Sequence, residues 1–223
     1  DTNQQLLEVT VDGKSIGTPE SYTYKNLTLN SRIVATFTGA MLFLDVRRED
    51  WFYSDVRYVV EHGLFHGTTQ ELFSPNAPMT RGMLVTVLYR LAGSPKSAAD
   101  SGFADVTADK YYADAVAWAA ESGIVSGVSD GRFAPDTQVT REQLAAILYR
   151  YARDKHYDTD KTADLTGFAD YGQISSYAAE ALSWANAEGL VNGRSETALS
   201  PQGQATRAEV AAILHRFAEN VAK

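Results

Sequence analysis

The chain has no cysteine, which excludes disulfide bridges and thiolate metal sites. It also has no apolar run close to the ~20 residues that span a bilayer, and its first residues lack the charged and apolar regions of a signal peptide. Positive charge is scarce as well, because the formal net charge is −8. We therefore predict no membrane insertion and no broad nucleic-acid binding, and an anionic ligand would need positive charge concentrated locally.

Signatures of catalysis are missing too. No Gly-x-Ser-x-Gly elbow, phosphate loop or zinc-protease motif occurs. His62 and His66 have the spacing of a helical metal pair, but a glycine follows each histidine and predicts that the helix ends between them. The acidic residues form no evident pair of the kind that glycan hydrolysis requires, so a hydrolase is the weaker alternative. We predict a chain that is no enzyme and uses neither cofactor nor metal.

What the chain does contain is a repeat. A Thr-Arg pair and an upstream Phe-x-Asp segment occur three times in the same order, with offsets of 60 and 66 residues between the pairs. Repeats of this size indicate one supersecondary unit stacked on itself, and 44% hydrophobic residues suffice for its core. The pairs are Thr80-Arg81, Thr140-Arg141 and Thr206-Arg207, and the upstream segments begin at Phe43, Phe103 and Phe168.

Each repeat predicts two helices. The first helices are expected at 53–62, 112–122 and 177–188, each followed by a glycine suited to the left-handed turn after a helix. The second helix opens at the Thr-Arg pair and carries apolar residues at i, i+3, i+4 and i+7. One helix pair cannot bury this stripe alone, whereas three can around a shared axis. We therefore predict a mainly α fold with a central three-helix bundle, and an open solenoid is the alternative.

The N-terminal segment differs from the repeats. Leu7, Val9 and Val11 alternate with polar residues and lead into an Asp12-Gly13 turn, and further strands are expected at 22–29 and 32–37. So few strands make a marginal domain. We interpret residues 1–40 as the tail of a larger β module, similar to small β repeats of bacterial surface proteins, in a fragment of a longer protein.

The Thr-Arg pair predicts a helix cap. Thr140 with Gln143, and Thr206 with Glu209, form capping boxes in which each side chain satisfies a backbone N–H of the other residue. Thr80 lacks this partner, because Met83 cannot accept a hydrogen bond from the cap backbone.

The arginine that follows each threonine has no role in capping. The positive end of the helix dipole mildly disfavours a cation there, so its presence in all three copies indicates another function. An arginine beside free helix N–H groups would make a site for a carboxylate or phosphate. A salt bridge between repeats is the alternative.

These landmarks resemble the S-layer homology domain over about residues 42–222. The resemblance rests on the Phe-x-Asp opening, the aromatic residue of the first helix, the Gly-x-x-x-Gly loop, the Phe-x-Pro segment and the Thr-Arg-Ala-Glu type motif. It implies a pseudo-threefold spindle with repeats at 41–98, 99–160 and 161–223. It also implies an extracellular cell-wall or S-layer location and binding of a secondary cell-wall polysaccharide, often pyruvylated, in grooves between repeats.

The resemblance also implies a set of binding residues. A guanidinium and helix N–H groups would take the ketal carboxylate, an indole would take the sugar face, and loop glycines would let backbone amides approach. Core packing is the alternative for the tryptophans. Copy two matches the family pattern best, so a groove involving Arg141 is favoured. The implied residues are Arg81, Arg141, Arg207, Trp118, Trp184, Gly67, Gly127 and Gly193.

Other partners stay open at this stage. The same grooves would serve a protein-interaction scaffold that binds acidic surfaces, including those of neighbouring surface-protein subunits. Peptidoglycan itself is a further alternative to the secondary polymer.

Overall fold

The computed structural model describes residues 6–23, 31–37, 43–97 and 100–222. The chain divides into two compact units. One unit contains residues 1–50 together with 67–73, and the other contains residues 51–66 together with 74–223.

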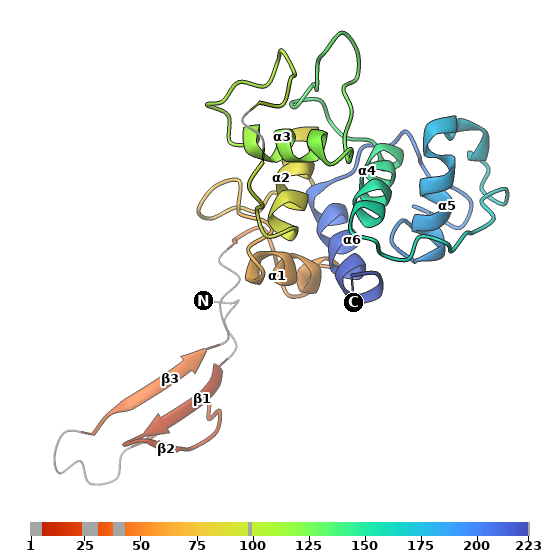
Figure 1. The fold of residues 1–223 in the computed structure, drawn as a ribbon. Helices are drawn as coiled ribbons and strands as arrows, with labels where there is room; N and C mark the ends of the chain where they lie inside the picture. Colours follow the sequence, from red (N-terminus) through yellow and green to blue (C-terminus); the bar gives the residue numbers. More distant parts are fainter. Residues whose placement is uncertain (1–5, 24–30, 38–42, 98–99, 223) are drawn as a thin grey trace. The chain divides into compact units, whose positions relative to one another are not determined.

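The first unit contains a small antiparallel sheet (Figure 1). Strands β1 (Leu6–Val11), β2 (Lys14–Ser15) and β3 (Ile33–Phe37) lie in the order β2-β1-β3. Asp12 and Gly13 form the turn between β1 and β2 with φ of 52° and 79°, values that glycine adopts readily. Val9 and Val11 are buried while Glu8 is exposed, which confirms the predicted alternation at these residues, and the predicted turn is confirmed. Of the strand expected at 22–29, residues 24–29 lie outside the described residues, and residues 22 and 23 belong to no strand.

The same unit holds the opening of the first repeat. The Oδ1 of Asp45 accepts a hydrogen bond of 2.8 Å from the backbone N–H of Phe73. The backbone N–H of Leu44 donates to the carbonyl of Glu71, and the rings of Phe43 and Phe73 pack 5.6 Å apart. The Phe-x-Asp segment therefore holds the loop that leads to the second helix.

The second unit is helical, and its described residues form six α-helices and two short 3₁₀ turns. Each first helix ends before a glycine with φ of 67–69°, as predicted, at Gly63, Gly123 and Gly189. The predicted bounds of the first helices are confirmed to within two residues. The helices are α1 (Tyr53–Glu61), α2 (Arg81–Leu91), α3 (Ala113–Glu121), α4 (Arg141–Asp154), α5 (Ala179–Ala187) and α6 (Arg207–Asn220), with 3₁₀ turns η1 (Tyr171–Gln173) and η2 (Ser176–Ala178) before α5.

A closed triangle of backbone hydrogen bonds joins the three repeats. The N–H of Met79 donates to the carbonyl of Ala205, Ala205 donates to Val139, and Val139 donates back to Met79, over 2.8–3.0 Å. These three residues occupy the same position in successive repeats. The helices close the same ring, because α2 packs on α3, α4 on α5, and α6 on α1. The arrangement is a ring and excludes the open solenoid.

The apolar stripes of the second helices form the core of this ring. Figure 1 places α2, α4 and α6 in the middle of the helical unit, with α1, α3 and α5 outside. Leu84, Leu144 and Val210, one from each stripe, are fully buried. No helix in the described part of the chain combines the length and hydrophobicity needed to cross a membrane. The predicted fold, mainly α around a central bundle and preceded by a small β segment, is confirmed.

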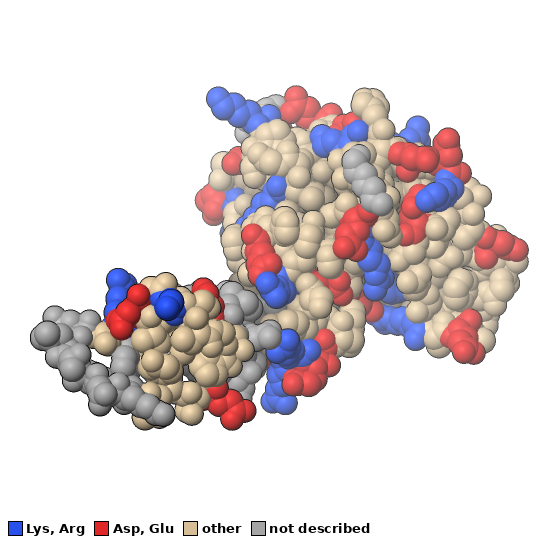
Figure 2. Space-filling view, turned by 90° about the horizontal axis from the view of Figure 1, so that it is seen from below, with Lys and Arg blue, Asp and Glu red and all other residues tan. Residues whose placement is uncertain are grey.

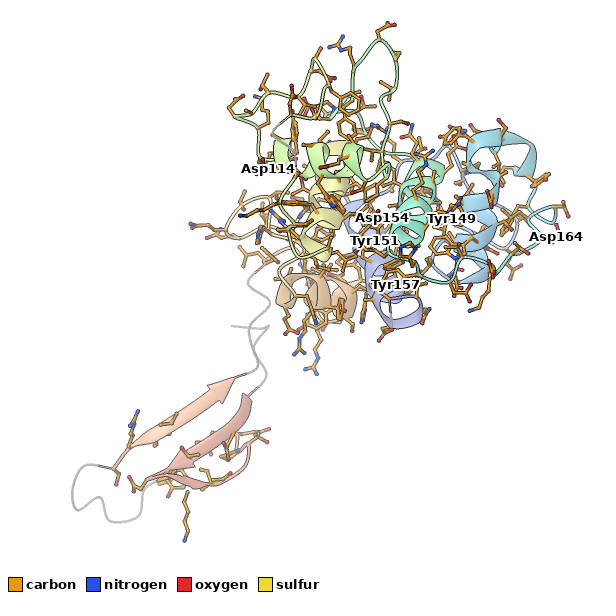
Figure 3. The ribbon with its side chains drawn as sticks, viewed as in Figure 1. Asp114, Tyr149, Tyr151, Asp154, Tyr157 and Asp164 are labelled. Carbon is orange, nitrogen blue, oxygen red and sulfur yellow. The ribbon has the colours of Figure 1, made fainter. Side chains whose placement is uncertain are left out.

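Two tyrosines of α4 show how the central helices contact different neighbours (Figure 3). The ring of Tyr149 packs 5.3 Å from Trp184 of α5, whereas the ring of Tyr151 packs 5.8 Å from Phe217 of α6. Tyr157, after the end of α4, lies 5.9 Å from the same phenylalanine. Aromatic packing therefore joins α4 to both of its neighbours.

Candidate functional site

The aspartates of the Phe-x-Asp segments clamp a loop rather than face a ligand. The carboxylate of Asp170 accepts hydrogen bonds from the N–H groups of Leu199 and Ser200 at 2.9 and 2.7 Å. These N–H donors hold the pKa of Asp170 below its ordinary value, against a smaller opposing effect of burial. Asp105 accepts in the same way from Phe133 and Ala134, both at 2.8 Å. This clamp positions the loop whose carbonyls bind the arginines.

The loop glycines are required by packing within each repeat. A Cβ on Gly127 would lie 2.8 Å from the carbonyl oxygen of Arg132 and 3.0 Å from the ring of Phe103. A Cβ on Gly193 would lie 2.9 Å from the ring of Phe168, and Gly67 is equally crowded by Phe43 within the first unit. Close approach of protein atoms is therefore enough to require glycine at these positions, although Gly127 and Gly193 also line pockets.

Arg81 of the first repeat reaches into the loop of the second. Its Nε donates to the carbonyl of Phe133 at 3.0 Å and its Nη2 to that of Ser126 at 3.2 Å. The guanidinium also lies 4.6 Å from the centre of the Phe133 ring. Burial lowers the pKa of Arg81 and the nearby charge of Arg150 lowers it further, while Tyr177 and the charge of Asp105 act in the opposite direction. The site therefore holds a cation that has lost much of its hydration.

The helix N–H groups beside the arginines are already used. The backbone N–H of Arg81 donates to the carbonyl of Thr137 and that of Gly82 to Pro135, at 2.9 and 2.8 Å. The amides of Arg141 and Arg207 donate likewise to Gly203 and Ala77. The expectation of free helix amides at the anion site is wrong, because the next repeat supplies carbonyls to them. The guanidinium alone carries the positive charge toward a ligand.

A pocket of about 470 Å³ opens beside Arg81, lined by residues of all three repeats. Arg150 of α4 enters it and forms no hydrogen bond or ion pair with any described residue. Arg81 likewise forms no ion pair with a described carboxylate. Two guanidiniums thus share one pocket, and neither forms an ion pair with a described carboxylate. The other lining residues are Val125, Ser126, Gly127, Val128, Gln143, Ala146, Ile147 and Tyr177.

A buried carboxylate fixes the aromatic wall of this pocket. Glu142, 2% exposed, accepts hydrogen bonds from the hydroxyls of Tyr177 and Ser175 at 3.0 and 2.7 Å. It also accepts from the Ser175 N–H and from the amide of Gln202. Burial and the hydrogen bond to Glu142 raise the pKa of Tyr177 to about 12, so its ring stays neutral. The ring is about half exposed and available to a ligand.

Arg141 lies in an equivalent but smaller pocket of about 280 Å³. Its Nε donates to the carbonyl of Leu199 at 3.1 Å and its Nη2 to that of Asn192. Unlike Arg81, it faces a carboxylate, because its Nη1 lies 3.6 Å from Oε1 of Glu209. Trp51 takes the place that Tyr177 has in the Arg81 pocket.

Arg207 repeats part of this geometry. Its Nη2 donates to the carbonyl of His66 at 2.7 Å, and its guanidinium lies 5.3 Å from the centre of the Phe65 ring. The ring of His62 stacks on Tyr58, and its Nδ1 contacts the Tyr58 carbonyl. No cluster of three or more metal-ligating side chains occurs among the residues that the structure describes.

The tryptophans expected to face sugar lie in the core. Trp118 is 5% exposed and packs 5.6 Å from Tyr89, and Trp184 is 1% exposed. Neither lines the pocket of Arg81 or that of Arg141. Trp184 borders a separate hollow of about 350 Å³ beside Tyr149. Their burial matches the core-packing alternative and leaves little indole surface for a ligand.

The sequence reasoning missed the aromatic and the second cation of the pocket. Trp51, Tyr111 and Tyr177 share one repeat position and are all exposed. The offsets of 60 and 66 residues would have identified both sets. The second set is Arg90, Arg150 and Arg216.

The face of the molecule seen in Figure 2 carries charges of both signs. Lys and Arg are interspersed there with Asp and Glu, without a broad area of one sign. This mixture fits the net charge of −8.

Comparison with known proteins places these repeats in a family. The family described as S-layer homology domain matches residues 42–82, 102–145 and 167–211. A surface-layer 125 kDa protein of Lysinibacillus sphaericus is 32% identical over 74% of this chain and 14% of its own length. An amylopullulanase of Thermoanaerobacterium thermosulfurigenes is 30% identical over 83% of this chain and 10% of its own.

A third relative extends the comparison to another S-layer protein. The S-layer protein of Bacillus thuringiensis subsp. finitimus is 22% identical over 86% of this chain and 25% of its own length. The chain thus spans between a tenth and a quarter of these three relatives. The three tandem matches cover more than half of the sequence, and the chain belongs to the S-layer homology domain family, whose domains anchor S-layer and other surface proteins at the bacterial cell wall.

Proposed function

We propose that this module binds an acidic cell-wall polysaccharide in the Arg81 pocket. The observation that carries the proposal is a pair of guanidiniums, Arg81 and Arg150, that form no ion pair with a described carboxylate and lie beside the exposed ring of Tyr177. A sugar carboxylate would complete the charge, because arginine and carboxylate form strong charge-assisted hydrogen bonds. The phenol ring would pack on the apolar face of the pyranose.

A pyruvylated secondary polymer fits this pocket best. A pyruvate ketal places a carboxylate next to a methyl group, and the pocket places guanidiniums next to apolar surface. The apolar surface comes from Val125, Ala146 and Ile147. A neutral glycan would leave the two cations unpaired. We therefore assign an acidic polymer as the ligand, and wall material stripped of that polymer distinguishes it from peptidoglycan, whose own carboxylates belong to lactyl and peptide groups.

The module acts as an anchor without chemistry of its own. Its repeats are proposed to span residues 41–98, 99–160 and 161–223, after a β segment at 1–40. Many copies of the module along one polymer would add avidity to a modest single-site affinity. The activity in the name of the amylopullulanase belongs to that protein, of which this chain matches only 10%.

Binding to purified wall material tests the proposal. Arg81→Ala should lower the affinity at least about tenfold, because it leaves the ligand carboxylate without its main partner. The matched control is Arg57→Ala, since Arg57 pairs with Glu61 on the exposed face of α1 and lines neither arginine pocket. Arg57→Ala should bind as the unmodified chain does.

The wall material itself supplies the second arm of the test. Chemical removal of the non-peptidoglycan polymer should abolish pull-down of the chain. Undiminished binding to the stripped wall would identify peptidoglycan as the ligand and overturn the proposal. Binding that needs a surface protein and not the polymer would instead indicate an interaction scaffold.

A further inference from the structure

The pockets of Arg81 and Arg141 are built from equivalent positions and differ in several side chains, two of which change the charge. Gln143 lines the first pocket, and Glu209 takes its place in the second. Val128 of the first is replaced by Arg194 in the second. We infer that Glu209, held by Arg194, closes the Arg141 pocket with a carboxylate of the chain itself. This inference rests on the proposed function and concerns which pocket binds.

Several hydrogen bonds join Arg194 and Glu209. Nε and Nη2 of Arg194 lie 3.1 and 2.9 Å from Oε1 of Glu209, and Nη2 also lies 3.0 Å from Oε2. The same Nη2 donates to the carbonyl of Gln204 at 2.7 Å. Forked arginine–carboxylate pairs of this kind are strong and geometrically specific. We call this pair the latch.

Glu209 of the latch offsets the positive charge of Arg141, which a ligand carboxylate would otherwise bind. Oε1 of Glu209 lies 3.6 Å from Nη1 of Arg141, so the arginine already faces a carboxylate oxygen. The nearby charge of Glu209 raises the pKa of Arg141 against the larger lowering effect of burial. A ligand carboxylate arriving there would be repelled by Glu209 and would have to displace it. The Arg81 pocket imposes no such cost, because Gln143 is neutral.

The volumes and the second cation support the same conclusion. The latched pocket measures about 280 Å³, compared with about 470 Å³ beside Arg81. Arg216, which corresponds to Arg150, donates to the carbonyl of Leu190 at 3.3 Å, whereas Arg150 has no described partner. The Arg141 pocket is therefore smaller, internally paired and less available to an anion.

The chain itself provides the substitutions that would open the latch. Gln143 retains the helix cap as an amide, since its Oε1 accepts from the Thr140 N–H at 3.2 Å. Glu209→Gln should therefore preserve the cap on Thr206 while removing the negative charge. Arg194→Val copies the residue at position 128. Together they give the Arg141 pocket the charges of the Arg81 pocket, while Asn192 in place of Ser126 and Trp51 in place of Tyr177 remain.

Calorimetric titration with a methyl glycoside carrying a 4,6-pyruvate ketal tests the latch in the full chain. In the unmodified chain, Arg81→Ala should lose at least about tenfold in affinity, while Arg141→Ala should change it less than about twofold. In the Arg81→Ala background, Glu209→Gln with Arg194→Val should restore binding, and a further Arg141→Ala should remove it again. None of these variants should bind the same glycoside without the ketal.

Two results separate the latch from the proposed function. If Arg141→Ala weakens the unmodified chain as much as Arg81→Ala does, or if the latch substitutions restore nothing, the latch is overturned and the Arg81 site stands. If no folded variant binds the ketal glycoside or the wall polymer, the proposed function itself is overturned. Far-ultraviolet circular dichroism confirms folding, and Glu209→Gln alone provides a milder variant that should restore part of the binding.

Discussion

At the scale of single residues, buried Glu142 does not line the Arg81 pocket but holds a residue that does, Tyr177. Its carboxylate collects hydrogen bonds from Ser175, Tyr177 and Gln202, all C-terminal to α4 in the chain. Glu142 therefore positions the aromatic ring against which a sugar would lie.

Two substitutions of Tyr177 separate its ring from its hydroxyl. Tyr177→Phe removes the bond to Glu142 but keeps the ring. Because Glu142 still holds the same segment through the N–H and hydroxyl of Ser175, we expect the affinity for the ketal glycoside to stay within about twofold. Tyr177→Ala removes the stacking surface and should cost about 1 kcal/mol or more, which is about fivefold in Kd. Titration calorimetry measures both, and equal losses for the two variants would contradict a stacking role.

Replacement of Glu142 tests its positioning role. Glu142→Gln keeps the size but offers an N–H group to neighbours that are themselves donors, and we expect a loss of about 1–3 kcal/mol in unfolding free energy. Denaturation in urea measures this loss. The affinity for the ligand, followed by fluorescence anisotropy, is a second readout. The double variant Tyr177→Phe with Glu142→Gln should lose no more affinity than Glu142→Gln alone.

At the scale of elements, the loop clamp explains why each second helix begins where it does. Asp170 holds the N–H groups of Leu199 and Ser200, and the chain then turns into the cap of α6. The cap at Thr206 has both hydrogen bonds of a capping box, as does the cap at Thr140. Thr80 accepts only from the N–H of Met83. Each helix start thus depends on the cap beside it and on the aspartate clamp from the beginning of the same repeat.

The clamp predicts how stability depends on acid. The pKa of Asp170 lies below its ordinary value in the folded chain, so its stabilising contribution is complete above the unfolded value of about 3.9 and is lost as pH falls through the folded pKa. Asp170→Asn should lower stability near neutral pH and flatten the dependence below pH about 4. Thermal melts across pH check this, and an unchanged acid limb would contradict it.

The distance along the chain between interacting residues decides what the sequence could reveal. Helices, caps and terminal glycines were predictable, because residues within a few positions determine them. The pockets were not, because Arg81 meets carbonyls of residues 126 and 133, far along the chain. The role expected for Trp118 and Trp184 conflicts with burial against tyrosines of the preceding repeat, a contact that depends on how repeats stack. The preference for Arg141 stays a prediction, and the capping motif gave no sign that Glu209 lies 3.6 Å from the Arg141 guanidinium.

At the scale of the whole helical unit, closure depends on the junction between α6 and α1. His215 of α6 contacts Asp55 of α1 through Nδ1 at 2.8 Å, and its ring stacks 4.1 Å from Tyr58. The other junctions use tyrosine against tryptophan, as between Tyr149 and Trp184. The ring is therefore completed by a polar contact between residues 160 positions apart.

Weakening this junction should affect all three repeats together. His215→Ala removes the contact with Asp55 and the stacking on Tyr58, and we expect a loss of about 1–3 kcal/mol in unfolding free energy. In a ring, every repeat depends on both neighbours, so urea transitions followed by tryptophan fluorescence and by circular dichroism should shift together and remain coincident. Arg57→Ala, which removes only an exposed pair on α1, should change stability by less than about 1 kcal/mol. Separate transitions in His215→Ala would show that the repeats behave as a linear array, because only there can a terminal repeat unfold while its neighbours stay folded.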